Sequence, residues 1–202
     1  MVKIKSTKLK TSKTEILHLL IAWIVISFAF AVLLNDRKFD SSFGKIFLAA
    51  TFSVGIGFLL HELAHKIVAQ KYGLFAEFRA DFMMLLIAVA FSFFGFILAA
   101  PGAVFIHGAI TKEKNGKISL AGPLTNIVLS LIFLGLFLSF RPENFFLNLT
   151  LKYGMLINAW LAVFNMIPIW NFDGRKILEW SKSAYAITLI SAIVLAFVSY
   201  LV

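Results

Sequence analysis

The sequence predicts an all-α polytopic membrane protein with five to six transmembrane helices, a re-entrant segment and short β-strands. Of its 202 residues, 60% are hydrophobic and only 14% are charged. A soluble domain of this length is nearer half apolar and a quarter charged. A hydrocarbon core about 30 Å thick needs roughly 20 apolar residues in each crossing helix. Several stretches of this chain reach that length.

Six stretches are candidates for crossing helices. The first is apolar apart from His18 and Ser27, the second is interrupted by one polar motif, and the other four carry no charge. In chain order they are residues 17–34, 46–70, 82–100, 118–140, 153–170 and 183–202. The polar stretches between them are short, so we expect residues 1–202 to form a single membrane-embedded domain.

The net charge of +9 comes from 19 Lys and Arg against 10 Asp and Glu. In a membrane protein such an excess is typical of loops on the cytoplasmic side, so we expect the lipid bilayer, and no nucleic acid, to be a partner. Five lysines precede the first apolar stretch, which has no obvious cleavage site, so we expect it to remain as a helix. The chain has no Cys, which excludes disulfides and thiolate metal ligands.

The polar motif in the second stretch reads HELAH. Positions four apart share one face of a helix, so His61 and His65 can present ring nitrogens to one metal ion. Glu62 lies about 100° further around the helix, where it is poorly placed as a ligand but can accept a proton from water. The alternative is a polar cluster that only joins helices, although ionisable residues inside a membrane are costly and usually functional. The motif predicts a catalytic zinc site with one zinc per chain.

A catalytic zinc site needs a third protein ligand and one open position. His18 lies at the head of the first stretch, where it can reach interfacial water, and His107 lies in a polar turn region. Asp173 follows a break at Pro168 and precedes Gly174, so its carboxylate can turn inward. The same carboxylate can instead cap the helix that follows it.

Three segments, HELAH, SLAGPLTNI and NMIPIWNFDG, resemble in the right order the signature regions of the site-2 protease family of intramembrane zinc metalloproteases. The resemblance implies that His61, His65 and Asp173 bind zinc and that Glu62 is the catalytic base. It also implies that Asn165, eight residues before the aspartate, helps to hold the substrate or polarises its carbonyl.

The resemblance extends over residues 46–178, roughly two-thirds of the chain. The last segment departs from the family's pattern at two positions. Phe172 stands where the family often has Leu or Met, and Arg175 stands where a second glycine is common. These departures concern the local backbone and leave the ligand assignment unchanged.

The path of residues 82–106 decides whether Asp173 can reach the histidines. If residues 82–100 form a plain crossing helix, Asp173 arrives on the far side of the membrane, and the basic residues divide 10 against 9. If residues 82–106 dip in and return, Asp173 arrives on the side of the histidines, together with 14 of the 19 basic residues. Positive-inside bias favours the re-entrant path. We therefore expect the N-terminus and the site to face the cytoplasm.

These features predict an intramembrane zinc metalloprotease of the cell membrane that cuts peptide bonds in or near transmembrane segments of membrane-protein substrates, as in regulated intramembrane proteolysis. In the resembled family, strands lie near the site, and a free strand edge can hold an extended substrate. One alternative is a membrane zinc transporter, which does not explain the position of Glu62. Another is an inactive relative that binds membrane helices, which the intact motif disfavours. No pattern specifies the natural substrate or the oligomeric state.

Overall fold

Five helices in the described part of the chain are long and apolar enough to cross a membrane. The computed structural model describes residues 10–97 and 101–202. The crossing helices are α1 (Lys13–Leu34), the continuous helix Phe43–Lys71, α5 (Lys112–Phe140), α6 (Phe145–Asn165) and α8 (Lys182–Leu201). The remaining elements are β1 (Phe75–Ala80), α4 (Phe82–Ser92), β2 (Gly102–His107) and α7 (Asp173–Trp180). The protein is therefore an all-α polytopic membrane protein with a small two-stranded sheet.

The second crossing helix contains a turn of different geometry just before the HELAH motif. It consists of α2 (Phe43–Ala50), the π-helical turn η1 (Thr51–Gly55) and α3 (Ile56–Lys71). The turn lies against α1, where the Trp23 indole donates to the carbonyl of Thr51 at 3.2 Å. Such π-turns interrupt the regular hydrogen-bond ladder and are frequent at functional sites. Here the turn changes the hydrogen-bond pattern of the helix immediately before α3, which carries the polar motif.

The described residues 82–97 do not form a crossing helix. α4 has 11 residues, which is about 16 Å of helix and about half of a hydrocarbon core. The chain returns to where it left β1, because the amide of Asp81 donates to the carbonyl of Pro101 at 3.1 Å. The re-entrant path is thus confirmed, and the alternative of a plain spanning helix is wrong. Residues 98–100 lie outside the described part.

Helix α6 begins earlier and ends earlier than the predicted stretch 153–170. Its first turn is capped by Asn144, whose side chain accepts from the amide of Leu147 at 3.1 Å. The helix ends at Asn165, three residues before Pro168, because a proline inside the helix would remove a hydrogen bond and clash with the preceding turn. The loop that follows carries the chain directly to α7.

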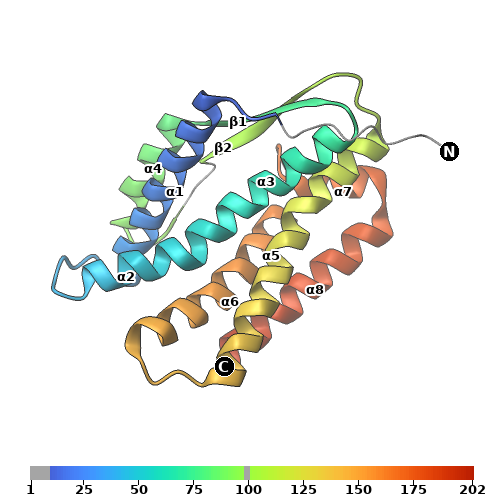
Figure 1. Cartoon of the computed structure of the whole chain (residues 1–202). Helices are drawn as coiled ribbons and strands as arrows, with labels where there is room; N and C mark the ends of the chain where they lie inside the picture. Colours follow the sequence, from blue (N-terminus) through green and yellow to red (C-terminus); the bar gives the residue numbers. More distant parts are fainter. Residues whose placement is uncertain (1–9, 98–100) are drawn as a thin grey trace.

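Figure 1 shows how these elements meet. Helix α3 runs beside α5, and α7 lies against the upper part of α5, while α6 and α8 pack on its other sides. The sheet lies at the same end of the molecule as the C-terminal end of α3 and the start of α5. The loops α1–α2 and α5–α6 lie at the opposite end. The HELAH motif, the sheet and α7 therefore share one end of the bundle.

The outer edge of β1 is closed by side chains instead of a third strand. The three side chains belong to α1 and α3 and contact alternate residues of β1, and we call them the side-chain ladder. Gln70 donates to the Ala76 carbonyl at 3.1 Å. Glu15 accepts from the Phe78 amide at 3.0 Å, and His18 accepts from the Ala80 amide at 3.2 Å.

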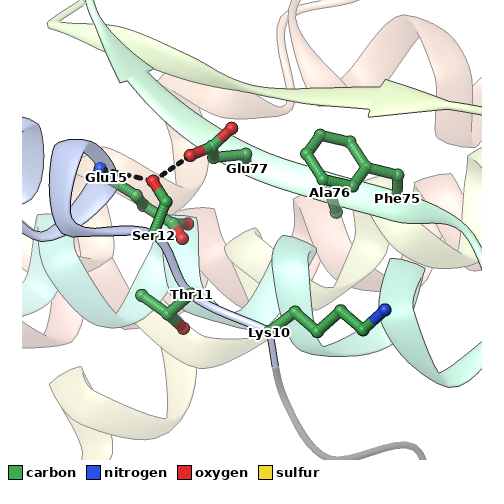
Figure 2. A pocket seen from close by; sticks show the side chains of 7 residues that line it. All are labelled: Lys10, Thr11, Ser12, Glu15, Phe75, Ala76 and Glu77. Atoms are coloured by element: carbon green, nitrogen blue, oxygen red, sulfur yellow. Dashed lines mark hydrogen bonds between the residues drawn. The ribbon is translucent and has the colours of Figure 1, made fainter.

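A pocket of about 200 Å³ lies between residues 10–12 and the start of β1 (Figure 2).

Within residues 10–97 and 101–202, no strand or side chain pairs with the edge of β2 that faces away from β1, so this is the open edge of the sheet. Ala76, Phe78 and Ala80 point their backbone groups away from β2, because the side-chain ladder binds them. In an antiparallel pair, residues directly opposite each other share this orientation. Their register partners are Ile106, Val104 and Gly102. These three residues therefore present their amide and carbonyl groups on the outer edge of β2.

Candidate metal centre

Two histidines and one aspartate from distant parts of the chain converge at one point. His61 and His65 lie one turn apart on α3, and Asp173 is the first residue of α7. The two histidine Nε2 atoms are 3.0 Å apart. Oδ2 of Asp173 lies 3.3 Å from Nε2 of His61 and 3.1 Å from Nε2 of His65. All three residues are buried. The structure thus brings together the three residues that the sequence predicts as metal ligands.

The other ring nitrogen of each histidine faces a hydrogen-bond acceptor. Nδ1 of His65 lies 2.8 Å from the carbonyl oxygen of Ile118, which can only accept, so this nitrogen carries the proton. Nδ1 of His61 lies 2.6 Å from Oδ1 of Asn126. The Asn126 amide nitrogen donates to the Gly57 carbonyl at 3.2 Å and to Asn158 Oδ1 at 3.0 Å, which fixes its oxygen toward His61. In a neutral imidazole, both Nε2 atoms then present lone pairs to the centre.

The arrangement of donor atoms fits a zinc ion. Two nitrogen lone pairs and a carboxylate oxygen face one another, and a single proton among them can bridge only two of the three atoms at a time. A cation satisfies all three groups. Ligands 2.0–2.1 Å from a tetrahedral zinc lie about 3.3 Å from one another, close to the distances of 3.0 to 3.3 Å found here. His61, His65 and Asp173 could therefore hold Zn²⁺ and leave a fourth position open.

Gly122 of α5 lies directly against both imidazoles. A Cβ atom at this position would lie 2.5 Å from Cε1 and Nε2 of His65 and 2.6 Å from Cε1 of His61. Every other amino acid therefore clashes with the rings. The next residue, Pro123, is buried in the same helix. The segment SLAGPLTNI thus packs against both histidine rings at Gly122.

The position of Asp173 depends on a close approach between α7 and the end of α6. A Cβ atom on Gly174 would lie 2.1 Å from the carbonyl oxygen of Met166, so only glycine fits here. The residue at the N-cap of α7 is Phe172, which makes no side-chain capping bond. Asp173 is therefore not the cap of this helix, and its carboxylate faces the histidines. Lys176, one turn later, has its ammonium 3.9 Å from Asp173 Oδ1.

Glu62 lies beside the three candidate ligands and is not one of them. Its side chain is half-buried, and it directly follows His61 in α3. Among the described residues no hydrogen bond or ion pair engages its carboxylate. The group is thus available to accept a proton, the role that the HELAH spacing predicts for it.

The remaining predicted residues lie outside this cluster. Asn165 is half-buried at the end of α6, and its side-chain amide donates to the Leu161 carbonyl of the same helix at 2.9 Å. His18 belongs to the side-chain ladder, and its ring lies edge-on against Phe82. His107 is exposed at the end of β2. Neither histidine is placed to act as the third metal ligand.

Two buried asparagines that support the candidate centre were not predicted from the sequence. Asn126 holds His61, and Asn158 of α6 holds Asn126, as described above. Asn158 also donates to the carbonyl of Gly154 at 2.8 Å, and both asparagines are fully buried. The one available signal was the location of Asn126 inside SLAGPLTNI. Asn158 lies in no motif, and only the packing of α6 against η1 and α5 reveals it.

Comparison with known proteins shows the family of this chain. No family model and no solved structure matches it. Two curated proteins of Methanocaldococcus jannaschii do. One, named "Putative zinc metalloprotease", is 40% identical over 178 residues, covering 87% of this chain and 89% of that protein. The other, named "Zinc metalloprotease", is 31% identical over 126 residues, covering 61% of this chain and 31% of that protein. Together with the candidate metal centre described above, this similarity shows that the chain belongs to a zinc metalloprotease family.

Proposed function

We propose that this protein is an intramembrane zinc metalloprotease of the site-2 protease type. It hydrolyses peptide bonds in or near transmembrane segments of other membrane proteins. The observation that carries the proposal is the convergence of His61, His65 and Asp173 inside a bundle of apolar helices, with Glu62 beside them. A metal site made for structure alone is normally closed by four protein ligands, whereas three ligands leave a position for water or substrate.

The chemistry divides between the metal and the side chains around it. Zn²⁺ held by the three residues would supply a Lewis acid, which acidifies water and polarises a carbonyl. The Glu62 carboxylate accepts a proton from the attacking water and delivers it to the nitrogen of the leaving amine. Asn165 donates a hydrogen bond to the oxygen of the scissile carbonyl. Its amide must exchange its bond to Leu161 for one to the substrate.

The depth of the site provides a route for water. His65 lies six residues before the end of its helix at Lys71, which corresponds to about 9 Å of helix. The loops at this end of the bundle carry most of the basic residues, which supports an orientation with the site toward the cytoplasm. Water enters from that side and does not have to cross the hydrocarbon core.

The sheet offers a place for an unwound substrate. A peptide bond in a helix is shielded by its own hydrogen bonds, so a transmembrane segment must become extended before it is cut. An extended segment can pair with the outer edge of β2, where Gly102, Val104 and Ile106 present their backbone groups. The side-chain ladder on β1 leaves β2 as the open edge of the described sheet.

Reconstitution in liposomes tests the proposal. The purified protein is combined with a model substrate that has one transmembrane segment, and products are identified by mass spectrometry. We expect cleavage that stops on chelation and resumes with added zinc. Zinc uptake into the liposomes without cleavage would instead indicate a transporter. Zinc binding and substrate binding without cleavage would indicate an inactive relative, and either result would overturn the proposal.

A further inference from the structure

A buried ion pair outside the proposed chemistry lies next to the metal-binding motif. Lys66 directly follows His65, and its ammonium contacts the carboxylate of Glu15 in α1. The exposed fraction is 3% for the lysine side chain and 0% for the glutamate side chain. The Lys66 ammonium also donates to the Thr11 hydroxyl at 2.8 Å. Charges buried among apolar helices are costly, and their retention points to a role.

Glu15 is diverted from the task that its sequence context predicts. Residues 12–15 have the capping-box pattern S-x-x-E, and the Ser12 hydroxyl accepts from the Glu15 amide at 3.0 Å, as that motif requires. In a capping box the glutamate side chain returns to the amide of the serine. Here Oε2 of Glu15 binds Lys66, and Oε1 accepts from the Phe78 amide at 3.0 Å. The carboxylate therefore joins the metal-binding helix to β1.

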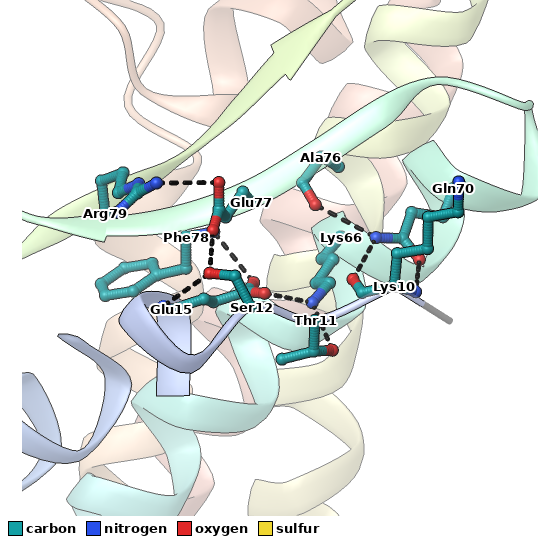
Figure 3. A network of polar contacts seen from close by, with 10 residues as sticks. All are labelled: Lys10, Thr11, Ser12, Glu15, Lys66, Gln70, Ala76, Glu77, Phe78 and Arg79. Atoms are coloured by element: carbon teal, nitrogen blue, oxygen red, sulfur yellow. Dashed lines mark hydrogen bonds and ion pairs between the residues drawn. The ribbon is translucent and has the colours of Figure 1, made fainter. Parts of the chain in front are cut away.

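The same strand is attached to α3 at further points. Gln70, one turn after Lys66, donates to the Ala76 carbonyl (Figure 3). The Phe78 ring packs edge-on against Phe58 of α3, with ring centroids 5.8 Å apart. With the bonds of Glu15 and His18, the bond of Gln70 completes a row of contacts to every second residue of β1, the spacing at which a neighbouring strand would form its bonds. They hold β1 at one height along α3.

The position of the sheet is coupled to the metal centre through Ile118. The Ile118 side chain packs in one buried cluster with Ala76 of β1 and Ile106 of β2. Its carbonyl oxygen is the acceptor for His65 Nδ1. One residue thus contacts the sheet with its side chain and orients a metal ligand with its backbone. A shift of the sheet along α3 would change the distance between the outer edge of β2 and the metal.

We propose that Glu15 is a positioning residue that sets the height of the sheet beside the metal centre, and thereby selects which peptide bond of a bound segment is cut. The inference rests on the proposed function. Successive residues of a strand are about 3.3 Å apart, so a displacement of that size presents a neighbouring peptide bond to the metal. The ion pair with Lys66 keeps the Glu15 carboxylate in place, and the hydrogen bond from the Phe78 amide to this carboxylate positions β1.

Two double variants separate the positioning bond from the buried charges. Both remove the ion pair together, so neither leaves an unpaired buried charge. E15Q/K66M keeps an oxygen that accepts from the Phe78 amide, whereas E15L/K66M does not. We expect both variants to bind one zinc per chain. E15Q/K66M cuts a single-span model substrate at the wild-type bond, while E15L/K66M cuts it at several neighbouring bonds and with a KM several-fold higher.

Hydrogen exchange of the Phe78 amide provides a readout that is independent of proteolysis. This amide should stay protected in the wild type and in E15Q/K66M and should exchange faster in E15L/K66M. If the wild type does not cleave any substrate, the proposed function fails, while the exchange experiment still tests the attachment of β1. Cleavage by E15L/K66M at the single wild-type bond with unchanged KM would overturn the inference. Cleavage by E15Q/K66M at several neighbouring bonds would overturn the inference as well.

Discussion

The Nδ1 atom of His61 lies 2.6 Å from the side-chain oxygen of Asn126, and this contact joins α3 to α5 in the buried interior. The amide of Asn126 is held in turn by Asn158 of α6. Three crossing helices thus contribute to the orientation of one imidazole. Partners of this kind fix the tautomer of a metal-binding histidine and raise its basicity.

Replacement of Asn126 by Ala should weaken zinc binding by about 10- to 100-fold, the usual effect of losing such a partner. The change removes the acceptor for the His61 Nδ1 proton but leaves all three predicted ligands. Competition with a fluorescent zinc chelator measures the affinity. Asn148→Ala serves as the control, because this asparagine donates to the Pro142 carbonyl at the opposite end of the bundle. Equal zinc affinities in the two variants would show that Asn126 does not support the metal.

Gly122→Ala should abolish zinc binding although it adds a single methyl group. The new carbon would lie 2.5 Å from the His65 ring, so the imidazole must move away from the centre. Gly135→Ala in the same helix is the matched control, because nothing lies within 4 Å of a Cβ atom at that position. Zinc content after dialysis distinguishes the two variants. Normal zinc content in Gly122→Ala would contradict the described packing of α5 on the histidines.

Asp173→Asn tests the third ligand. The substitution keeps the size of the side chain but removes the anionic oxygen that faces both histidines. We expect normal folding and insertion, with loss of most zinc affinity and of cleavage. Loss of a mere helix cap would cost about 1 kcal/mol of stability and would spare the metal. A variant with full zinc content would therefore exclude Asp173 as a ligand.

The membrane class of the protein, and the convergence of three distant residues at one site, could be predicted from the sequence. The spacing of His61 and His65 is a local property of a helix. With residues 82–106 re-entrant, the parity of the crossing segments brings Asp173 to the same end. The re-entrant path of residues 82–106 followed from the distribution of basic residues. Each of these inferences depends on spacing, length or charge, which a sequence displays directly.

The supporting residues could not be predicted, because they depend on contacts between helices far apart in the chain. Nothing near Asn158 in the sequence indicates that it holds Asn126. The need for glycine at position 122 appears only when the two imidazoles are in place. Residues 12–15 even suggest an ordinary capping box, whereas the Glu15 side chain binds Lys66 and β1. The hydrogen-bond partners of polar groups inside a bundle are determined by how the helices pack in three dimensions.

Cysteine labelling tests the orientation in the membrane. The chain has no Cys, so single substitutions can be labelled without background. Thr111→Cys, just before α5, should react with an impermeant reagent only from the cytoplasmic side, because 14 of the 19 basic residues lie in the predicted loops of that side. Glu143→Cys, in the α5–α6 loop, should react only from outside. Both positions are exposed. The reverse pattern would contradict the proposed orientation.

Glu62→Gln gives the most direct test of the proposed catalytic centre. The change keeps the shape of the side chain and leaves His61, His65 and Asp173 untouched, but it removes the carboxylate that accepts and delivers the proton. The measurement is zinc content and cleavage of the single-span substrate on the same preparation. We expect one zinc per chain, as in the wild type, and no detectable cleavage. Cleavage at the wild-type rate by a zinc-loaded Glu62→Gln variant would contradict the assignment of Glu62 as the base.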